Sequence, residues 1–354
     1  MTDAENYVFD FEKEVEQYFI DFPQLRATTV FVDTSGNRRK ACFDIEEAAA
    51  RCPAFAEILK EIKYRIQDRA GSISYDGQEP EFRGEYNGVL LDSRNDPILI
   101  YPPDVNRAYV LDHEAGHILT KWTKSNIYHG NAADAFAAIC HLRRFGNDPQ
   151  ALSLLSCFRS YEMISYGETS HLTTSAVNQI IRDSQFKDFK SMSPEETIEA
   201  AKNYAVTCTP SALEAQAALE FSFEIKHASK SKGSVKSHVE LLASTALSSS
   251  SPFIFETFGV SIIKPFLLIS DGATLRGEHI AFDRETREKF CDKFIERAHQ
   301  LGLHEIAAEL GKIRADALTP APEADSKACP ASEPFAKPPY QNRPVSVRPS
   351  PASR

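Results

Sequence analysis

The chain has 354 residues, of which 25% are charged and 42% hydrophobic, and its formal net charge is −10 at pH 7. This length allows a large core, in two domains or in one domain with two lobes. The negative charge argues against a dedicated nucleic-acid binder, and no apolar stretch reaches the roughly 18–20 residues that cross a bilayer. The acidic N-terminus does not look like a secretory signal, so we expect a cytoplasmic protein with no membrane partner.

The seven cysteines are odd in number and include no C-x-x-C pair. Such usage indicates reduced thiols rather than a disulfide framework or a thiolate zinc site. A metal site in this chain would therefore use histidine and carboxylate ligands.

The N-terminal third alternates short strand-like and helix-like segments. Residues 27–33 have the composition of a strand, and residues 53–68 have the apolar spacing of an amphipathic helix. Residues 87–92 and 97–101 flank a four-residue turn, which predicts a β-hairpin. Asp104 follows this hairpin as the predicted N-cap of the next helix.

The rest of the chain has mainly helical patterns. Gly146 is the predicted end of one helix, and Gly302 divides two others. The Ser-rich residues 243–252 are predicted to form a loop. The 36 residues from Thr319 onward include 9 prolines and few large apolar side chains, so we expect disorder. The predicted helices cover 105–122, 132–145, 175–183, 194–206, 211–226 and most of 284–313.

One motif in the helix after the hairpin carries chemistry: His113-Glu114-Ala115-Gly116-His117. Positions i and i+4 of a helix lie on the same face, so the two imidazoles can share one Zn²⁺. Glu114, beside the first histidine, is then placed to act as general base on a zinc-activated water. This spacing therefore predicts metal-assisted hydrolysis.

The motif, the upstream hairpin and the downstream Ala-Ala-Asp-Ala-Phe-Ala segment resemble the zincin superfamily of zinc metallopeptidases. The downstream segment is similar to the E-x-x-A-D pattern of families related to the gluzincins. In that pattern the Glu is the third zinc ligand, and the Asp supports a motif histidine. In this sequence Gly130 stands at the Glu position and Asp134 at the Asp position. Either Asp134 has become the ligand, or it keeps the supporting role and the ligand lies elsewhere.

The third zinc ligand is therefore the open question of the sequence. A metzincin-type histidine is excluded because its position holds Thr123, and no Glu occurs between Ile118 and Tyr161. Asp134, within a predicted helix, is the predicted ligand. His129 in the preceding loop is its competitor, and a more distant Glu is the third alternative. Examples of such a glutamate are Glu162 and Glu168.

Zincin hydrolysis also requires a donor to the oxyanion of the tetrahedral intermediate. His171, in a segment just before a predicted helix, is the first candidate, and Tyr166 beside Gly167 is the second. Tyr161 is a further candidate. One strand of the predicted hairpin would bind an extended substrate by strand addition.

We thus expect an α+β, zincin-like fold. Residues 1–130 would form a small mixed-sheet lobe ending in the motif helix, residues 131–318 a helical lobe, and residues 319–354 the disordered tail. The predicted function is zinc-dependent hydrolysis of a protein or peptide substrate, with His113, His117 and Asp134 as ligands. The alternatives are a zincin-fold binding or regulatory protein without turnover, and a bacterial effector protease delivered into another cell. The Pro-rich tail would serve as a linker or as a partner-binding segment.

Overall fold

The computed structural model describes residues 6–33, 40–41, 73–75, 87–91, 103–121, 126–146, 149–167, 169–228, 233–275 and 278–318. All of them belong to a unit that spans Met1–Leu318. Three predicted segments lie outside the described residues: the helix at 53–68, the strand at 97–101 and the tail from Thr319.

Helices dominate the described chain, and the predicted α+β fold with a sheet lobe is wrong. More than three quarters of the described residues are helical. The described strands have only two to five residues each. The strand-like patterns of the N-terminal third predicted a sheet lobe, but the described strands there are too short to dominate that part of the chain. The strands are β1 (Thr29–Asp33), β2 (Lys40–Ala41), β3 (Ile73–Tyr75), β4 (Asn87–Leu91), β5 (Ala273–Leu275) and β6 (Glu278–Ile280).

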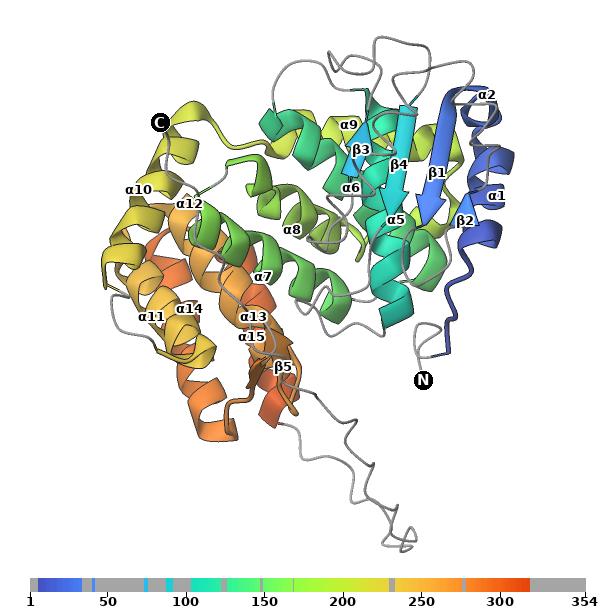
Figure 1. Cartoon of the computed structure of the whole chain (residues 1–354). Coiled ribbons are helices and arrows are strands. Elements are labelled where there is room, and N and C mark those ends of the chain that lie inside the picture. The colour runs from blue at the N-terminus through green and yellow to red at the C-terminus, as the bar shows by residue number, and fades with distance from the viewer. Residues whose placement is uncertain are drawn as a thin grey trace, which may run out of the picture. The chain divides into compact units, whose positions relative to one another are not determined.

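The first four strands pair side by side in the order β2-β1-β4-β3. β1 and β4 are parallel, with Phe31 opposite Val89, whereas β2 and β3 are antiparallel to their neighbours. β5 and β6 form a separate antiparallel pair. The helix α5 contacts β3 and β4 (Figure 1), so this ladder lies against the helix that carries the motif.

The helices run from one end of the described chain to the other (Figure 1). They are α1 (Phe11–Asp21), α2 (Leu25–Thr28), α5 (Pro103–Thr120), α6 (Asn126–Phe145), α7 (Pro149–Tyr166), α8 (Thr174–Asp183), α9 (Pro194–Cys208), α10 (Ala212–Ala228), α11 (Val235–Ser248), α12 (Pro252–Ile254), α13 (Ser261–Leu268), α14 (Arg284–Gln300) and α15 (His304–Leu318). Two short 3-10 helices, η2 (Thr169–His171) and η3 (Phe189–Ser191), and the π-helix η4 (Phe255–Val260) complete the set. Among the described residues, no helix has both the length and the apolar character of a membrane span.

Local sequence signals explain several helix boundaries. Gly146 and Gly302 both have φ +74°, the left-handed conformation that ends a helix, which confirms the predicted stop and the predicted break. Several boundaries differ from prediction. α5 begins at Pro103, so Asp104 lies within the first turn. α6 begins at Asn126 rather than at residue 132, so His129 lies in this helix and not in a loop before it. α11 continues into the predicted Ser-rich loop as far as Ser248. The helix persists there because Val239, Leu242, Ala243 and Ala246 are buried on one of its faces.

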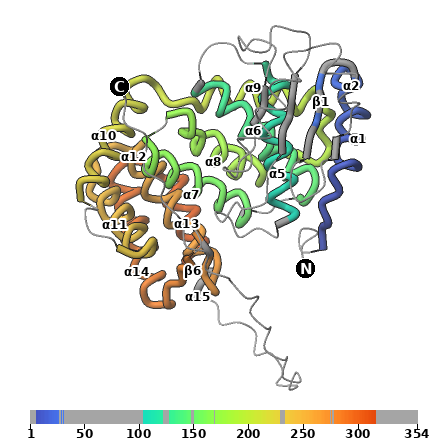
Figure 2. The backbone as a smooth tube through the Cα atoms, in the orientation of Figure 1, coloured from blue at the N-terminus to red at the C-terminus, as the bar shows by residue number. Residues whose placement is uncertain are grey.

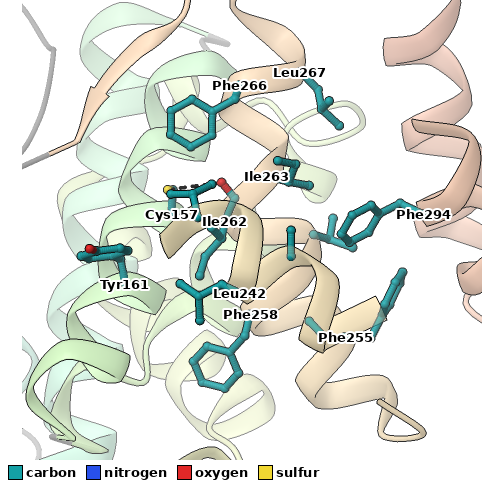
Figure 3. Close-up of a cluster of buried hydrophobic side chains, with 14 of the residues drawn as sticks. Cys157, Tyr161, Leu242, Phe255, Phe258, Ile262, Ile263, Phe266, Leu267 and Phe294 are labelled. Carbon is teal, nitrogen blue, oxygen red and sulfur yellow. Dashed lines mark hydrogen bonds between the residues drawn. The ribbon is translucent and has the colours of Figure 1, made fainter. Parts of the chain in front are cut away.

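Two clusters of buried side chains hold these helices together. The first joins α1, α5 and α6 to one side of α7, through residues such as Phe19, Leu111 and Phe136. The second joins the rest of α7 to the C-terminal helices, and α7 runs beside α13 (Figure 2). In that second cluster the Cys157 thiol donates to the carbonyl of Ile262, among phenylalanines of η4 and α14 (Figure 3). The predicted lobe boundary after residue 130 falls inside α6.

Candidate metal centre

The motif histidines are positioned by an unusually close contact between α5 and α6. A Cβ added to Gly116 would lie 3.0 Å from the Cα of Ala133 and 3.1 Å from its carbonyl oxygen. Real side chains rarely approach so closely, so only glycine allows the two backbones to meet there. This crossing determines where His113 and His117 lie relative to α6, because they are three residues before and one residue after Gly116 on the same helix.

The two motif imidazoles face each other. The Nε2 atoms of His113 and His117 are 3.1 Å apart, and the rings meet edge to face with centroids 4.6 Å apart. Both rings line a cavity of about 250 Å³. The residues around it come from α5, α6, α7 and η2: His113, His117, His129, Gly130, Asp134, Arg159, Ser170 and His171.

His117 is held in the neutral form. Burial lowers its pKa well below the ordinary value, and the neighbouring His113 and His129 lower it further. Its Nδ1 atom is buried and has no hydrogen-bond partner within the described part of the chain. A neutral imidazole is the form that binds a metal, so burial here favours coordination over protonation.

Asp134 lies behind His113. Its carboxylate is 2.7 Å from Nδ1 of His113 and accepts two hydrogen bonds from Arg159, one from Tyr109 and one from Thr173. Burial alone would raise the pKa of Asp134, but the positive Arg159 and the hydrogen bonds hold it well below its usual range. With five donors on two oxygens, Asp134 differs from the predicted third ligand. It matches the alternative, in which it supports a motif histidine.

A second histidine–carboxylate pair lies on the other side of Arg159. The Arg159 guanidinium donates to Glu162 at 3.2 Å, and the same carboxylate oxygen of Glu162 is 2.9 Å from Nδ1 of His171. Arg159 thereby joins two carboxylates, each of which holds the Nδ1 atom of a cavity histidine. Of the predicted oxyanion donors, His171 is the one that reaches this cavity.

Arg159 was not among the residues predicted from the sequence. A signal was nevertheless present, because Arg159 is the single basic residue of α7, where it precedes Glu162 by three positions. A cation in a mostly uncharged, buried helix requires acidic partners, and here these partners are Asp134 and Glu162.

Gly130, which stands at the Glu position of the gluzincin-related pattern, has no room for a side chain. A Cβ at Gly130 would lie 2.5 Å from the carbonyl oxygen of Ser170, so the backbone of η2 occupies the space in which a side chain would begin. His129, the competing ligand, also lines the cavity, and its Nε2 is 3.2 Å from the carbonyl oxygen of His117. The start of α6 therefore places His129 at the cavity. At Gly130 it leaves space for the backbone of η2, which carries His171.

Other predicted site residues lie outside the cavity lining. Glu114 is buried, with 6% of its surface exposed, yet it is not among the lining residues. Tyr166 is 54% exposed at the end of α7, and Tyr161 is buried with its hydroxyl 2.9 Å from Nδ1 of His238. The structure therefore does not bring either tyrosine to the predicted oxyanion position. Glu168 lies outside the described residues.

The chemistry of this cavity suits zinc only in part. Two Nε2 atoms 3.1 Å apart match a shared ion bound at about 2.0–2.1 Å from each, and the carboxylate behind His113 is the usual support for such a ligand. In the arrangement described, no three histidine, cysteine or acidic side chains converge closely enough to hold a metal. The two motif histidines fit the ion, and a third ligand requires a side chain to reorient.

Comparisons with protein-family models, with curated proteins and with solved structures find no match to this chain.

Proposed function

We propose that this protein is a zinc-dependent metallopeptidase that hydrolyses peptide bonds, with His113 and His117 as zinc ligands and Glu114 as general base. One observation supports it above the others: the Nε2 atoms of the i, i+4 histidine pair lie 3.1 Å apart and face a cavity. The choice of peptide bonds as substrate rests on the His113-Glu114-x-x-His117 motif and its resemblance to the zincins.

The surrounding residues would each have a defined task in this reaction. Asp134 accepts the Nδ1 proton of His113, which leaves the Nε2 lone pair available to the ion. Arg159 neutralises the buried Asp134 and fixes its orientation. Bound zinc would supply Lewis-acid activation of water near neutral pH. Glu114, next to His113 on α5, would take a proton from the attacking water and return it to the leaving amine.

A matched pair of proteins tests the proposal. Glu114→Gln keeps the shape of the side chain but removes its basicity, so it should retain zinc and lose proteolysis. The measurement is a proteome-wide comparison of cleavage products generated by the wild type and by Glu114→Gln, each loaded with one zinc. Equal cleavage by the two proteins would contradict the assignment of Glu114.

A second candidate function is zinc binding without turnover, in a binding or regulatory protein. Two observations favour it: Gly130 stands where the resembling pattern has a ligand, and Glu114 does not line the cavity. In that case the wild type would bind one zinc and produce no cleavage products. A cytoplasmic location, or delivery into another cell as an effector, belongs to the metallopeptidase proposal and rests on sequence alone.

A further inference from the structure

Two histidines that line the cavity have a carboxylate against Nδ1, and only one of them belongs to the motif. His113 and His171 come from different elements, α5 and η2, yet both line the cavity. Each has its Nδ1 atom against a carboxylate, at 2.7 Å from Asp134 and 2.9 Å from Glu162 respectively. A histidine that ligates a metal through Nε2 characteristically donates Nδ1–H to such a carboxylate.

We propose that His171 is the third protein ligand of the metal, which would make this a three-histidine centre of His113, His117 and His171. This inference rests on the proposed function, because it assumes that the motif histidines bind zinc. It assigns to His171 a direct role in metal binding instead of the predicted role as oxyanion donor.

Gly130 supports this assignment on steric grounds. The carbonyl of Ser170, the residue before His171, lies where a side chain at position 130 would begin. The segment that carries His171 therefore fills the place from which a Glu ligand would reach the metal. The contact between Gly130 and the Ser170 carbonyl therefore has two consequences. It leaves no room for a ligand side chain at position 130 of α6, and it brings the segment that carries His171 to the cavity.

Arg159 links the carboxylate beside His171 to the carboxylate beside His113. Its guanidinium bonds to Asp134 through Nε and one terminal nitrogen, and to Glu162 through the other. The two supporting carboxylates thus have a common donor that is itself nearly buried, with 13% of its side chain exposed. Because one rigid group orients both carboxylates, the Nδ1 atoms of His113 and His171 are held within one connected network.

His129 is the alternative third ligand, and its surroundings favour it less. Its Nε2 atom is engaged with the carbonyl oxygen of His117, and its ring packs on His117 with centroids 4.3 Å apart. Within the described ranges, no carboxylate is bonded to His129, whereas His171 has Glu162. His171 also lies on a three-residue helix with 29% of its side chain exposed, so its ring can move toward the motif, with Nδ1 kept on Glu162, without disturbing a core.

Zinc affinity of matched variants tests the assignment without any activity measurement. Each purified full-length variant is stripped of metal and titrated with Zn²⁺ against a chromophoric chelator. We expect His171→Ala to weaken zinc binding by at least 100-fold, and Glu162→Gln to weaken it by about 10–100-fold. His129→Ala, the matched control from the same cavity, should change affinity by less than about threefold. Circular dichroism of the metal-free proteins checks that each variant is folded.

Absorption of the Co²⁺-substituted protein gives a second readout. The wild type should show the intense visible bands of a tetrahedral site, and folded His171→Ala should show weaker bands, because the ion with one protein ligand fewer would bind additional water and have a higher coordination number. Wild-type affinity in His171→Ala, or a large loss in His129→Ala alone, would overturn the assignment of His171 while leaving the zinc site intact. A wild type that binds no zinc would overturn the proposed function together with this inference.

Discussion

At the scale of single residues, the site depends on carboxylates that do not touch the proposed metal. Asp134→Asn keeps the volume of the side chain but removes the charge that Arg159 and His113 require. We expect zinc affinity to fall by about 10–100-fold, as for other supporting carboxylates. Asp183→Asn is the matched control, because Asp183 accepts its bonds from Tyr204 and Lys187. Chelator competition on both variants should show a loss only for Asp134→Asn.

The sequence was sufficient to predict some of these residues and insufficient for others. The spacing of His113 and His117 is local, and helix geometry alone brings their rings together. Asp134 was singled out from the sequence, but its contacts include Arg159, which is 25 residues away along the chain. No periodicity encodes such a contact. The sequence therefore could not show that five donors surround Asp134, and these donors favour a supporting role over direct ligation.

At the scale of elements, the crossing of α5 and α6 at Gly116 positions the site. Gly116→Ala would force a Cβ to within 3.0 Å of Ala133, so the helices must separate. We expect a loss of about 1–3 kcal/mol in the free energy of unfolding, with weaker zinc binding because His117 is the next residue. Gly311→Ala in α15 meets nothing within 4 Å and should instead stabilise the protein by up to about 1 kcal/mol. Urea denaturation of the two variants provides the comparison, and equal effects would contradict the close crossing.

Helices with strong local signals were predicted well, whereas tertiary packing decided the remainder. The helix break at Gly302 was predicted from the conformational freedom of glycine, and the boundaries of α8 were predicted from apolar spacing. α7 was not predicted as a helix, since it is buried on most sides and has little amphipathic contrast; its buried residues include Leu152, Leu155, Cys157 and Ile164. The α+β class was wrong because the strand-like segments form strands of only two to five residues, within a chain that is otherwise mainly helical.

At the scale of the whole molecule, a buried charge network fixes α1 to the body. Asp112 is fully buried and receives two bonds from Arg144 and one from Tyr18 of α1, while Arg144 also bonds Glu14 of α1. Arg144→Met would leave the Asp112 carboxylate buried without its cation, at a cost of about 3–5 kcal/mol. Arg26→Met, which breaks an ion pair that is more than half exposed, should cost less than about 1 kcal/mol. Similar denaturation midpoints for both variants would contradict the network.

Buried histidines make the stability of the molecule depend on pH. Burial lowers the pKa of His141 to about 3, and the nearby Arg144 adds to this shift. An unfolded chain binds this proton at about pH 6.5, so stability present at neutral pH is lost as the pH falls from about 6.5 toward 3. His141→Gln should reduce the slope of unfolding free energy between pH 6 and pH 4 by up to about 1.4 kcal/mol per pH unit. Substitution of the exposed His227 should leave the slope as in the wild type.

The proposed function of the molecule depends on a metal at the histidine pair of α5. The most direct test is the zinc content of the purified full-length protein by inductively coupled plasma mass spectrometry, with His113→Ala and His117→Ala in parallel. We predict one zinc per wild-type chain and none above background in either variant, provided that circular dichroism shows all three to be folded. A wild type without zinc after reconstitution, or variants that keep it, would contradict the account.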